Sequence, residues 1–247
     1  MTYGTKLRLL WLANAITASY SLYVGEYLWV AILFSFLFVV VGGYAGWHRY
    51  FTHRSYQTSK FIHRKLLWWG ALQGLGKPIT VMSLHRYHHA HSDTDTDVHS
   101  PTNLSWWQIT FGYYKEPKLN RKYIKDLIKD KEIKFLQKYY FHVIISLNTI
   151  LLVIDPILPG LVFGIPNMWA IFTTGFVLNY LNHRNGKSNN NWLYALLTFG
   201  EGWHDNHHED SKRYSNQIKW YQLDPTGWII KYFLRRNNDV DHSLHST

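Results

Sequence analysis

The chain of 247 residues contains no cysteine. Disulfide bonds, iron–sulfur clusters, thiolate zinc sites and cysteine nucleophiles are therefore excluded. Positive charge is missing from two long stretches, although the chain carries 26 Lys and Arg against 16 Asp and Glu, a formal net charge of +10. No Lys or Arg occurs over residues 9–48 or over residues 139–183. Each stretch is long enough for a hairpin of two membrane-spanning helices, since one span needs about 20 apolar residues.

Turn residues divide each of these two stretches. The first divides at Gly25-Glu26, and the second at residues 155–160, which contain two prolines and a glycine. The sequence therefore predicts an all-α integral membrane protein with four transmembrane helices, in hairpins at about 9–47 and 139–182. The positive-inside rule places both termini and the long polar segments in the cytoplasm. A soluble protein with two buried helical hairpins is disfavoured, because a domain of this size rarely buries four such helices.

The polar segments, at about 48–138 and 183–247, are expected to form a cytoplasmic helical cap. Residues 61–72 and the segment after Asp224-Pro225 have the amphipathic pattern of helices that lie in the membrane interface. Residues 114–138 are basic and amphipathic, which predicts a surface helix against anionic lipid. Because membrane topology accounts for the positive charge, nucleic acid is not expected as a partner.

Histidine is abundant, with 15 residues in the chain, and eight of them form three spaced motifs. One motif is H-x-x-x-x-H and two are H-x-x-H-H; their members are His48 and His53, then His85, His88 and His89, then His204, His207 and His208. Chance accounts for only about 0.05 copies of H-x-x-H-H at this composition. Positions i, i+3 and i+4 share one helical face, so each H-x-x-H-H can direct its imidazoles at one point. Neutral imidazole binds iron, copper or zinc, and eight ligands exceed the need of one four-coordinate ion, which predicts two ions.

Other polar residues near the motifs are candidates for supporting roles. Asn179 and His183, spaced i, i+4 at the end of the fourth predicted span, add an amide and a ninth histidine on the same side of the membrane. Three acidic residues close to the motifs are expected to accept hydrogen bonds from ligating imidazoles, namely Asp93, Asp97 and Glu201. Isolated histidines are interpreted as ordinary polar residues, namely His63, His142, His242 and His245.

These motifs resemble the three histidine boxes of membrane fatty acyl desaturases. The matching segments are HRYFTH at His48–His53, HRYHH at His85–His89 and GEGWHDNHH at Gly200–His208. They are most similar to the branch of stearoyl-CoA and cyanobacterial delta-9 desaturases, and Asn179-x-x-x-His183 matches the family's additional ligand motif. The resemblance covers about residues 47–226, and the four-helix topology extends it to the N-terminus, so residues 1–247 are interpreted as a single desaturase domain.

The resemblance implies a non-haem di-iron enzyme that uses O2 and two electrons to introduce a cis double bond, at delta-9, into a saturated acyl chain. That chain would be linked to CoA, a carrier protein or a glycerolipid. In that family the nine histidines hold two irons, and the position of Asn179 contacts one iron through water. A separate electron donor, ferredoxin or cytochrome b5, is expected, because the chain has no cysteine and no flavin or dinucleotide fingerprint.

Two other functions remain open at the level of sequence. A related membrane di-iron hydroxylase would use the same ligands to insert oxygen into the acyl chain or lipid. A membrane protein that binds or transports metal would carry ionisable residues inside its spans. Apart from His142, the predicted spans hold none, which favours catalysis at the membrane surface.

Overall fold

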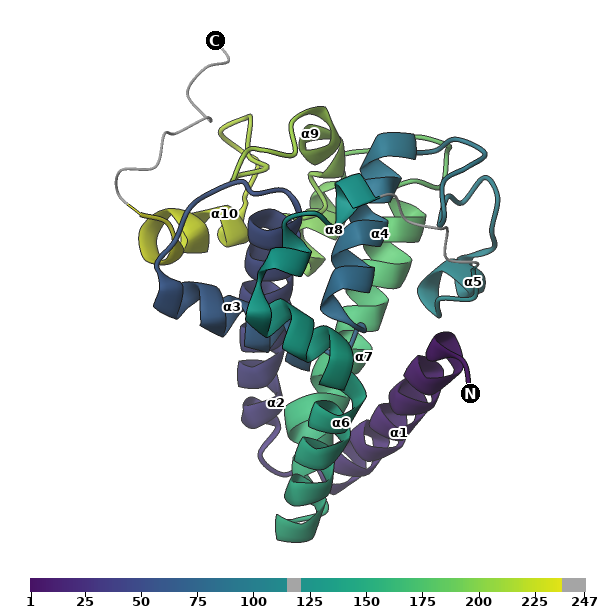
Figure 1. The fold of residues 1–247 in the computed structure, drawn as a ribbon, viewed down its shortest axis with the longest axis vertical. Helices are drawn as coiled ribbons and strands as arrows, with labels where there is room; N and C mark the ends of the chain where they lie inside the picture. The colour runs from purple at the N-terminus through teal and green to yellow at the C-terminus, as the bar shows by residue number, and fades with distance from the viewer. Residues whose placement is uncertain (115–120, 237–247) are drawn as a thin grey trace.

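The computed structural model describes residues 1–114 and 121–236, and over these residues the protein is helical without β-strands. Long helices occupy one half of the molecule, and short helices gather in the other half (Figure 1). The chain therefore separates an elongated helical bundle from a cap of short elements, as the alternation of apolar and polar segments predicts.

The first two long helices run in opposite directions (Figure 1). Helix α1 (Tyr3–Val24) begins where the Thr2 side chain accepts a hydrogen bond from the Thr5 amide, and it ends at Gly25. Gly25 has φ of +74°, a left-handed conformation that glycine adopts at little cost. Helix α2 (Leu28–Ser35) then continues without interruption into the π-helical segment η1 (Phe36–Thr52).

The second pair starts with α6 (Lys131–Ile154), which the Asp130 side chain caps by accepting from the amides of Glu132 and Ile133. The predicted turn follows, and the chain returns as one continuous helix made of η4 (Gly160–Gly164), α7 (Ile165–Ala170) and η5 (Ile171–Leu181). The sequence placed this hairpin and its turn correctly, although α6 begins eight residues before the predicted span at Tyr139.

Three helices among the described residues are long and apolar enough to cross a membrane. They are Leu28–Thr52, Lys131–Ile154 and Gly160–Leu181. Helix α1 is not among them, because residues such as Asn14, Thr17 and Ser21 interrupt its apolar sequence. The fourth span therefore remains a prediction.

Helix α1 nevertheless packs closely against η4. A Cβ atom placed on Gly160 would clash with the Ser21 hydroxyl oxygen, and one on Gly164 would lie 2.7 Å from the Asn14 carbonyl oxygen. Asn14 also donates a hydrogen bond of 2.9 Å to Asn167 of α7, and both side chains are buried. Small residues and interhelical amide bonds of this kind are typical of helices that associate inside a bilayer.

The predicted surface helix over residues 114–138 is wrong over residues 121–130, whereas residues 131–138 are helical as the first part of α6. Residues 115–120 lie outside the described residues, and only single 3₁₀ turns follow, η2 (Arg121–Tyr123) and η3 (Leu127–Lys129). Asp130 is extended, with ψ of 124°, so a new helix begins there. The physical reason is competition for the backbone: Asp126 pairs with two arginines of other segments, and Asp130 caps α6.

Short helices complete the cap. They are α3 (Lys60–Leu72), α4 (Pro78–His91), α5 (Trp106–Thr110), α8 (Trp192–Leu197), α9 (His204–Glu209), and α10 (Pro225–Ile229), which continues into η6 (Ile230–Leu234). The helices predicted at 61–72 and after Asp224-Pro225 are confirmed, and the Asp224 side chain caps α10 by accepting from the Gly227 amide. Helix α3 packs along η1 with Leu66 and Leu67 fully buried, which supports the end of η1 where the first histidine motif lies.

Candidate metal centre

All three histidine motifs meet at the end of the bundle that carries the short helices. His48 lies in the last turns of η1, and His53 follows it at the C-cap. The second motif lies on α4 and the third on α9, so their i, i+3, i+4 spacings do fall on helices. His183 lies two residues beyond η5. Segments that are up to 160 residues apart in sequence thus bring their imidazoles to one region of the cap.

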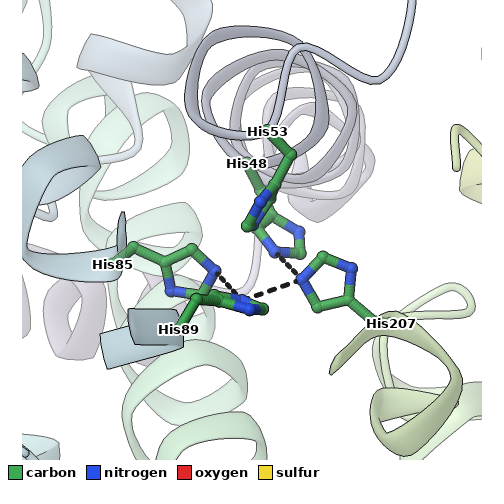
Figure 2. A group of neighbouring side chains, drawn as sticks. All are labelled: His48, His53, His85, His89 and His207. Atoms are coloured by element: carbon green, nitrogen blue, oxygen red, sulfur yellow. Dashed lines mark hydrogen bonds between the residues drawn. The ribbon is translucent and has the colours of Figure 1, made fainter. Parts of the chain in front are cut away.

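The first group contains five histidines whose ring nitrogens lie within 4.8 Å of one another, namely His48, His53, His85, His89 and His207. Figure 2 shows their rings converging from η1, α4 and α9. The Nε2 atom of His207 lies 3.0 Å from Nε2 of His48 and 3.1 Å from Nε2 of His89. The Nε2 atom of His89 also lies 3.1 Å from Nε2 of His85. Several nitrogen donors therefore face one small volume.

A second group lies beside the first and consists of His88, His183 and His208. The rings of His89, in the first group, and His208, in the second, stack with centroids 4.2 Å apart, so the groups are adjacent. His204 belongs to neither group, although its ring lies 4.9 Å from that of His183 and 4.7 Å from that of His208. A third combination, His88 with Asp97 and His99, shares His88 with the second group.

Carboxylates orient three of these histidines through their Nδ1 atoms. Nδ1 of His48 lies 2.9 Å from Glu201, Nδ1 of His88 lies 2.8 Å from Asp97, and Nδ1 of His183 lies 2.9 Å from Asp93. A carboxylate can only accept from Nδ1–H, so these contacts leave the Nε2 lone pair free to bind a metal. The three acidic residues singled out in the sequence all lie where they would support a ligand.

The pattern of unsatisfied atoms fits a metal centre. Among the described residues, the Nε2 atoms of His53, His183 and His208 are buried without a hydrogen-bond partner. Burying an unpaired polar atom is costly, and a coordinated cation removes that cost. Imidazole nitrogens without thiolates or many oxygens suit iron, copper or zinc better than calcium or magnesium. The donor set is thus compatible with a transition metal.

Burial also fixes the protonation state of the cluster. It lowers the pKa of His85, His88, His89, His204 and His207 well below the usual histidine value, and neighbouring imidazoles lower it further. For His208 burial and the nearby His183 lower the pKa to about 3. These side chains are therefore neutral near pH 7, and neutral imidazole is the form that binds metal.

Asn179 and a large cavity lie next to the histidines. The cavity has a volume of about 600 Å³, and its lining includes His48, His85, His204 and Asn179. Apolar side chains such as Leu84 and Leu178 also line it, as do Tyr3, Leu7 and Arg8 from the first turns of α1. Its volume lies within the range of about 300–1,000 Å³ typical of small-molecule sites. A ligand in this cavity would lie beside His48, His85 and His204.

The remaining histidines lie apart from the two groups. His63 contacts Asp130 at 2.9 Å, and His91 donates from Nδ1 to the Tyr87 carbonyl at 2.9 Å. His142 is exposed on α6 and contacts the ring of Tyr139. His242 and His245 lie outside the described residues.

Two arginines that the sequence analysis missed hold the motifs together. Each directly follows the first histidine of its motif, which is the sequence signal that marks them. Arg49, fully buried, bonds to Glu201 and Asp224 and so ties the first motif to the third. Arg86, after the first histidine of the second motif, donates to the carbonyls of Phe51 and Thr52 at the end of η1.

Arg86 also forms a bidentate pair with Asp126, at 2.7 and 2.9 Å. Burial alone would raise the pKa of Asp126, but hydrogen bonds from Arg86 and Arg54 hold it well below its usual value. A carboxylate with a lowered folded-state pKa stabilises the fold above its unfolded pKa of about 3.9, and the contribution is lost progressively as the pH falls from that value through the folded-state pKa.

We expect Asp126→Asn to lower the thermal midpoint of the purified protein by a few degrees at pH 7 and by less at pH 2, where the folded-state carboxylate begins to protonate. The loss corresponds to about 1 kcal/mol for a partly exposed ion pair. Asp95→Asn, at an exposed carboxylate, is the matched control and should shift the midpoint at neither pH. Equal destabilisation by Asp126→Asn at both pH values would contradict the charge-based account.

Helices long enough to span a membrane and histidine groups able to hold metal beside a cavity define a class of membrane-associated proteins with a candidate metal centre. Within that class, the chain belongs to the fatty acid desaturase family, whose family model matches residues 27–244. It is therefore an oxidoreductase of the acyl desaturase type.

Curated relatives agree with this assignment. The chain is 33% identical over 245 residues to an sn-1 stearoyl-lipid 9-desaturase of Anabaena variabilis, an alignment that covers 92% of this chain and 89% of that protein. It is 32% identical over 241 residues to an acyl-CoA 5-desaturase of Anemone leveillei, covering 91% and 73% of the two chains. A second sn-1 stearoyl-lipid 9-desaturase, of Synechocystis, is 33% identical over 220 residues, covering 83% and 69%. These relatives differ in double-bond position and in the carrier of the acyl chain.

Proposed function

We propose that this desaturase introduces a cis double bond at delta-9 of a saturated acyl chain, with two irons held by the histidine groups. The observation that supports the proposal most directly is the cavity, whose lining includes His48, His85 and His204. An acyl chain in that cavity would present one pair of methylene groups to the metals and keep its other carbons away from them. The depth of insertion would then select the bond that reacts.

The two metal positions follow from the two histidine groups. His48, His53, His85, His89 and His207 would hold one iron, and His88, His183 and His208 would hold the other. His204 faces the second group with its ring, and it would join that group by a change of side-chain orientation. Asn179, which lines the same cavity, would contact an iron through water. Irons held by these residues would supply the activation of O2 that the removal of two hydrogens from the substrate requires.

The protein's own residues would orient the metal ligands and enclose the acyl chain. Glu201, Asp97 and Asp93 hold three imidazoles by Nδ1 and direct their Nε2 atoms inward. Burial raises the pKa of Glu201, but Arg49 and then His48 reverse this, so the pKa is lowered and the residue stays a carboxylate acceptor. Apolar residues such as Leu84 and Leu178 would exclude water from the acyl chain.

Electrons must come from outside this chain. Reduction of O2 to two waters takes four electrons and four protons. Formation of one double bond supplies two hydrogens, which carry two of the electrons and two of the protons. A separate donor supplies the other two electrons, and the solvent supplies the other two protons. A ferredoxin or cytochrome b5 fits this role, because the positive charge of the chain would attract an acidic donor. We place the histidine motifs and both termini on the cytoplasmic side, with the acyl chain linked to CoA, a carrier protein or a membrane glycerolipid. The alternation of Lys- and Arg-rich segments with the four predicted spans supports this orientation.

The first test is gas chromatography–mass spectrometry of total fatty acids from a host that expresses the chain with a ferredoxin system. We expect a new monounsaturated chain that is absent with empty vector, with its double bond at carbon 9 in derivatised fragments. A double bond at carbon 5 would overturn the position only. Hydroxylated chains would overturn the proposal and indicate insertion of oxygen.

Metal analysis tests the two positions separately. We expect about two irons per wild-type chain purified from iron-supplemented cells, and about one for both His53→Ala and His183→Ala, because each variant removes a donor from a different group. His142→Ala, on exposed α6, is the control and should keep both irons. Loss of both irons in either variant alone would show one cooperative site rather than two separable ones.

A further inference from the structure

A buried ion cluster connects His48 to the start of α10. It consists of Arg49, Glu201 and Asp224, and all three side chains are 0% exposed. Glu201 bonds to His48 through Oε2 at 2.9 Å and to Arg49 through Oε1 at 2.8 and 2.9 Å. Asp224 accepts from Arg49 with both oxygens, at 2.8 and 2.9 Å. One guanidinium thus lies between two carboxylates, and only one of these touches a metal-facing histidine.

We propose that Arg49 is a positioning residue that sets the reduction potential of the metal site by controlling how strongly Glu201 accepts from His48. This inference rests on the proposed function, because it requires iron at the first histidine group. Reduction of a bound iron from ferric to ferrous takes one electron from the external donor. The side chains behind His48 therefore decide how readily that electron is accepted.

The sign of the effect follows from the hydrogen bonds. A carboxylate that accepts strongly from Nδ1–H makes the imidazole a more basic ligand, which favours the ferric state. Arg49 withdraws electron density from Glu201 by bonding to its other oxygen, and so weakens that effect. Removing the guanidinium should strengthen the Glu201–His48 bond and lower the potential.

Asp224 acts on Arg49 in the opposite direction. Its carboxylate shares the guanidinium with Glu201, and it is fixed by bonds from the Asn216 and Gly227 amides at 2.7 and 3.0 Å. With Asp224 neutralised, the guanidinium has only Glu201 as a charged partner and should draw more of its electron density. The potential should then rise, which gives two substitutions in one cluster with opposite expected signs.

Arg86 provides a matched comparison within the same chain. It follows the first histidine of the second motif, as Arg49 follows that of the first, and it also joins two segments. Its carboxylate partner is Asp126, which pairs with Arg54 on its other side. Loss of Arg86 therefore disturbs the fold near the metal centre without changing the charge on a histidine's hydrogen-bond acceptor.

The experiment measures the midpoint potential of purified, iron-57-loaded protein by mediated redox titration with Mössbauer detection. We expect Arg49→Gln to lower the reduction equilibrium constant at least tenfold, about 59 mV for one electron, and Asp224→Asn to raise it by a similar factor. Arg49→Lys, which keeps the charge, should restore part of the shift. Arg86→Gln should leave the reduction equilibrium constant within threefold of the wild-type value.

A second background tests whether the effect passes through Glu201. In Glu201→Gln protein, the shifts caused by Arg49→Gln and Asp224→Asn should fall to less than a third, since coupled residues show non-additive effects. Shifts of full size in the Glu201→Gln background would overturn the inference. So would shifts of the same sign for Arg49→Gln and Asp224→Asn, or no shift for either variant in iron-loaded protein. If Arg49→Gln does not fold, the shift caused by Asp224→Asn, compared between the wild-type and Glu201→Gln backgrounds, decides by the same criteria. Wild-type protein that binds no iron would instead overturn the proposed function.

Discussion

Replacing His207 with alanine is expected to lower desaturation at least 100-fold. Its Nε2 atom is 3.0 Å from that of His48 and 3.1 Å from that of His89, so it links η1, α4 and α9 at the centre of the first group. Loss of a residue that only supports a ligand typically costs 10–100-fold in metal affinity or activity, and loss of a ligand itself should cost more. The measurement is the monounsaturated product per mole of membrane-inserted protein.

The control for this substitution is His142→Ala, which removes the same side chain from an exposed position on α6. We expect product within twofold of wild type for that variant. The iron content of His207→Ala should fall together with its activity. A variant that keeps both its irons and its activity would show that His207 is dispensable, and the assignment of the first group would then be wrong.

The second large effect is expected from blocking the cavity without touching a histidine. Leu178 lines the cavity next to Asn179 and is 5% exposed, so a tryptophan there must project into the space assigned to the acyl chain. We expect Leu178→Trp to keep about two irons, and we expect its activity on long saturated chains to fall more than 10-fold. Activity on shorter chains should be reduced less, because they would not reach past the new ring.

Leu152→Trp is the matched control, because it makes the same exchange at a 51% exposed position of α6, where no packing is disturbed. That variant should desaturate at the wild-type rate. The measurement is the product distribution by chain length in gas chromatography, with protein amount and iron content determined in parallel. Unchanged activity and chain-length profile in Leu178→Trp would contradict the location of the acyl chain in this cavity.

Much of the architecture was predictable because it depends on local composition. The gaps in Lys and Arg located three helices that are long and apolar enough to span a bilayer, and the Asp224-Pro225 pair located the start of α10. The helix predicted over residues 121–130 is wrong because the structure there depends on a long-range contact. There the basic amphipathic pattern is present, but Asp126 bonds to Arg86, which lies 40 residues earlier, and such a contact leaves no local signal.

The sequence by itself determined the kind of chemistry this protein carries. Histidine spacing within a helix is a local property, so the H-x-x-H-H motifs already specified which imidazoles share a face. Only the tertiary structure decided how these faces divide into two groups, that Arg49 and Asp224 lie behind His48, and that the cavity passes beside His48. Those features depend on contacts between residues up to 175 positions apart, and chain packing rather than residue pattern brings such residues together.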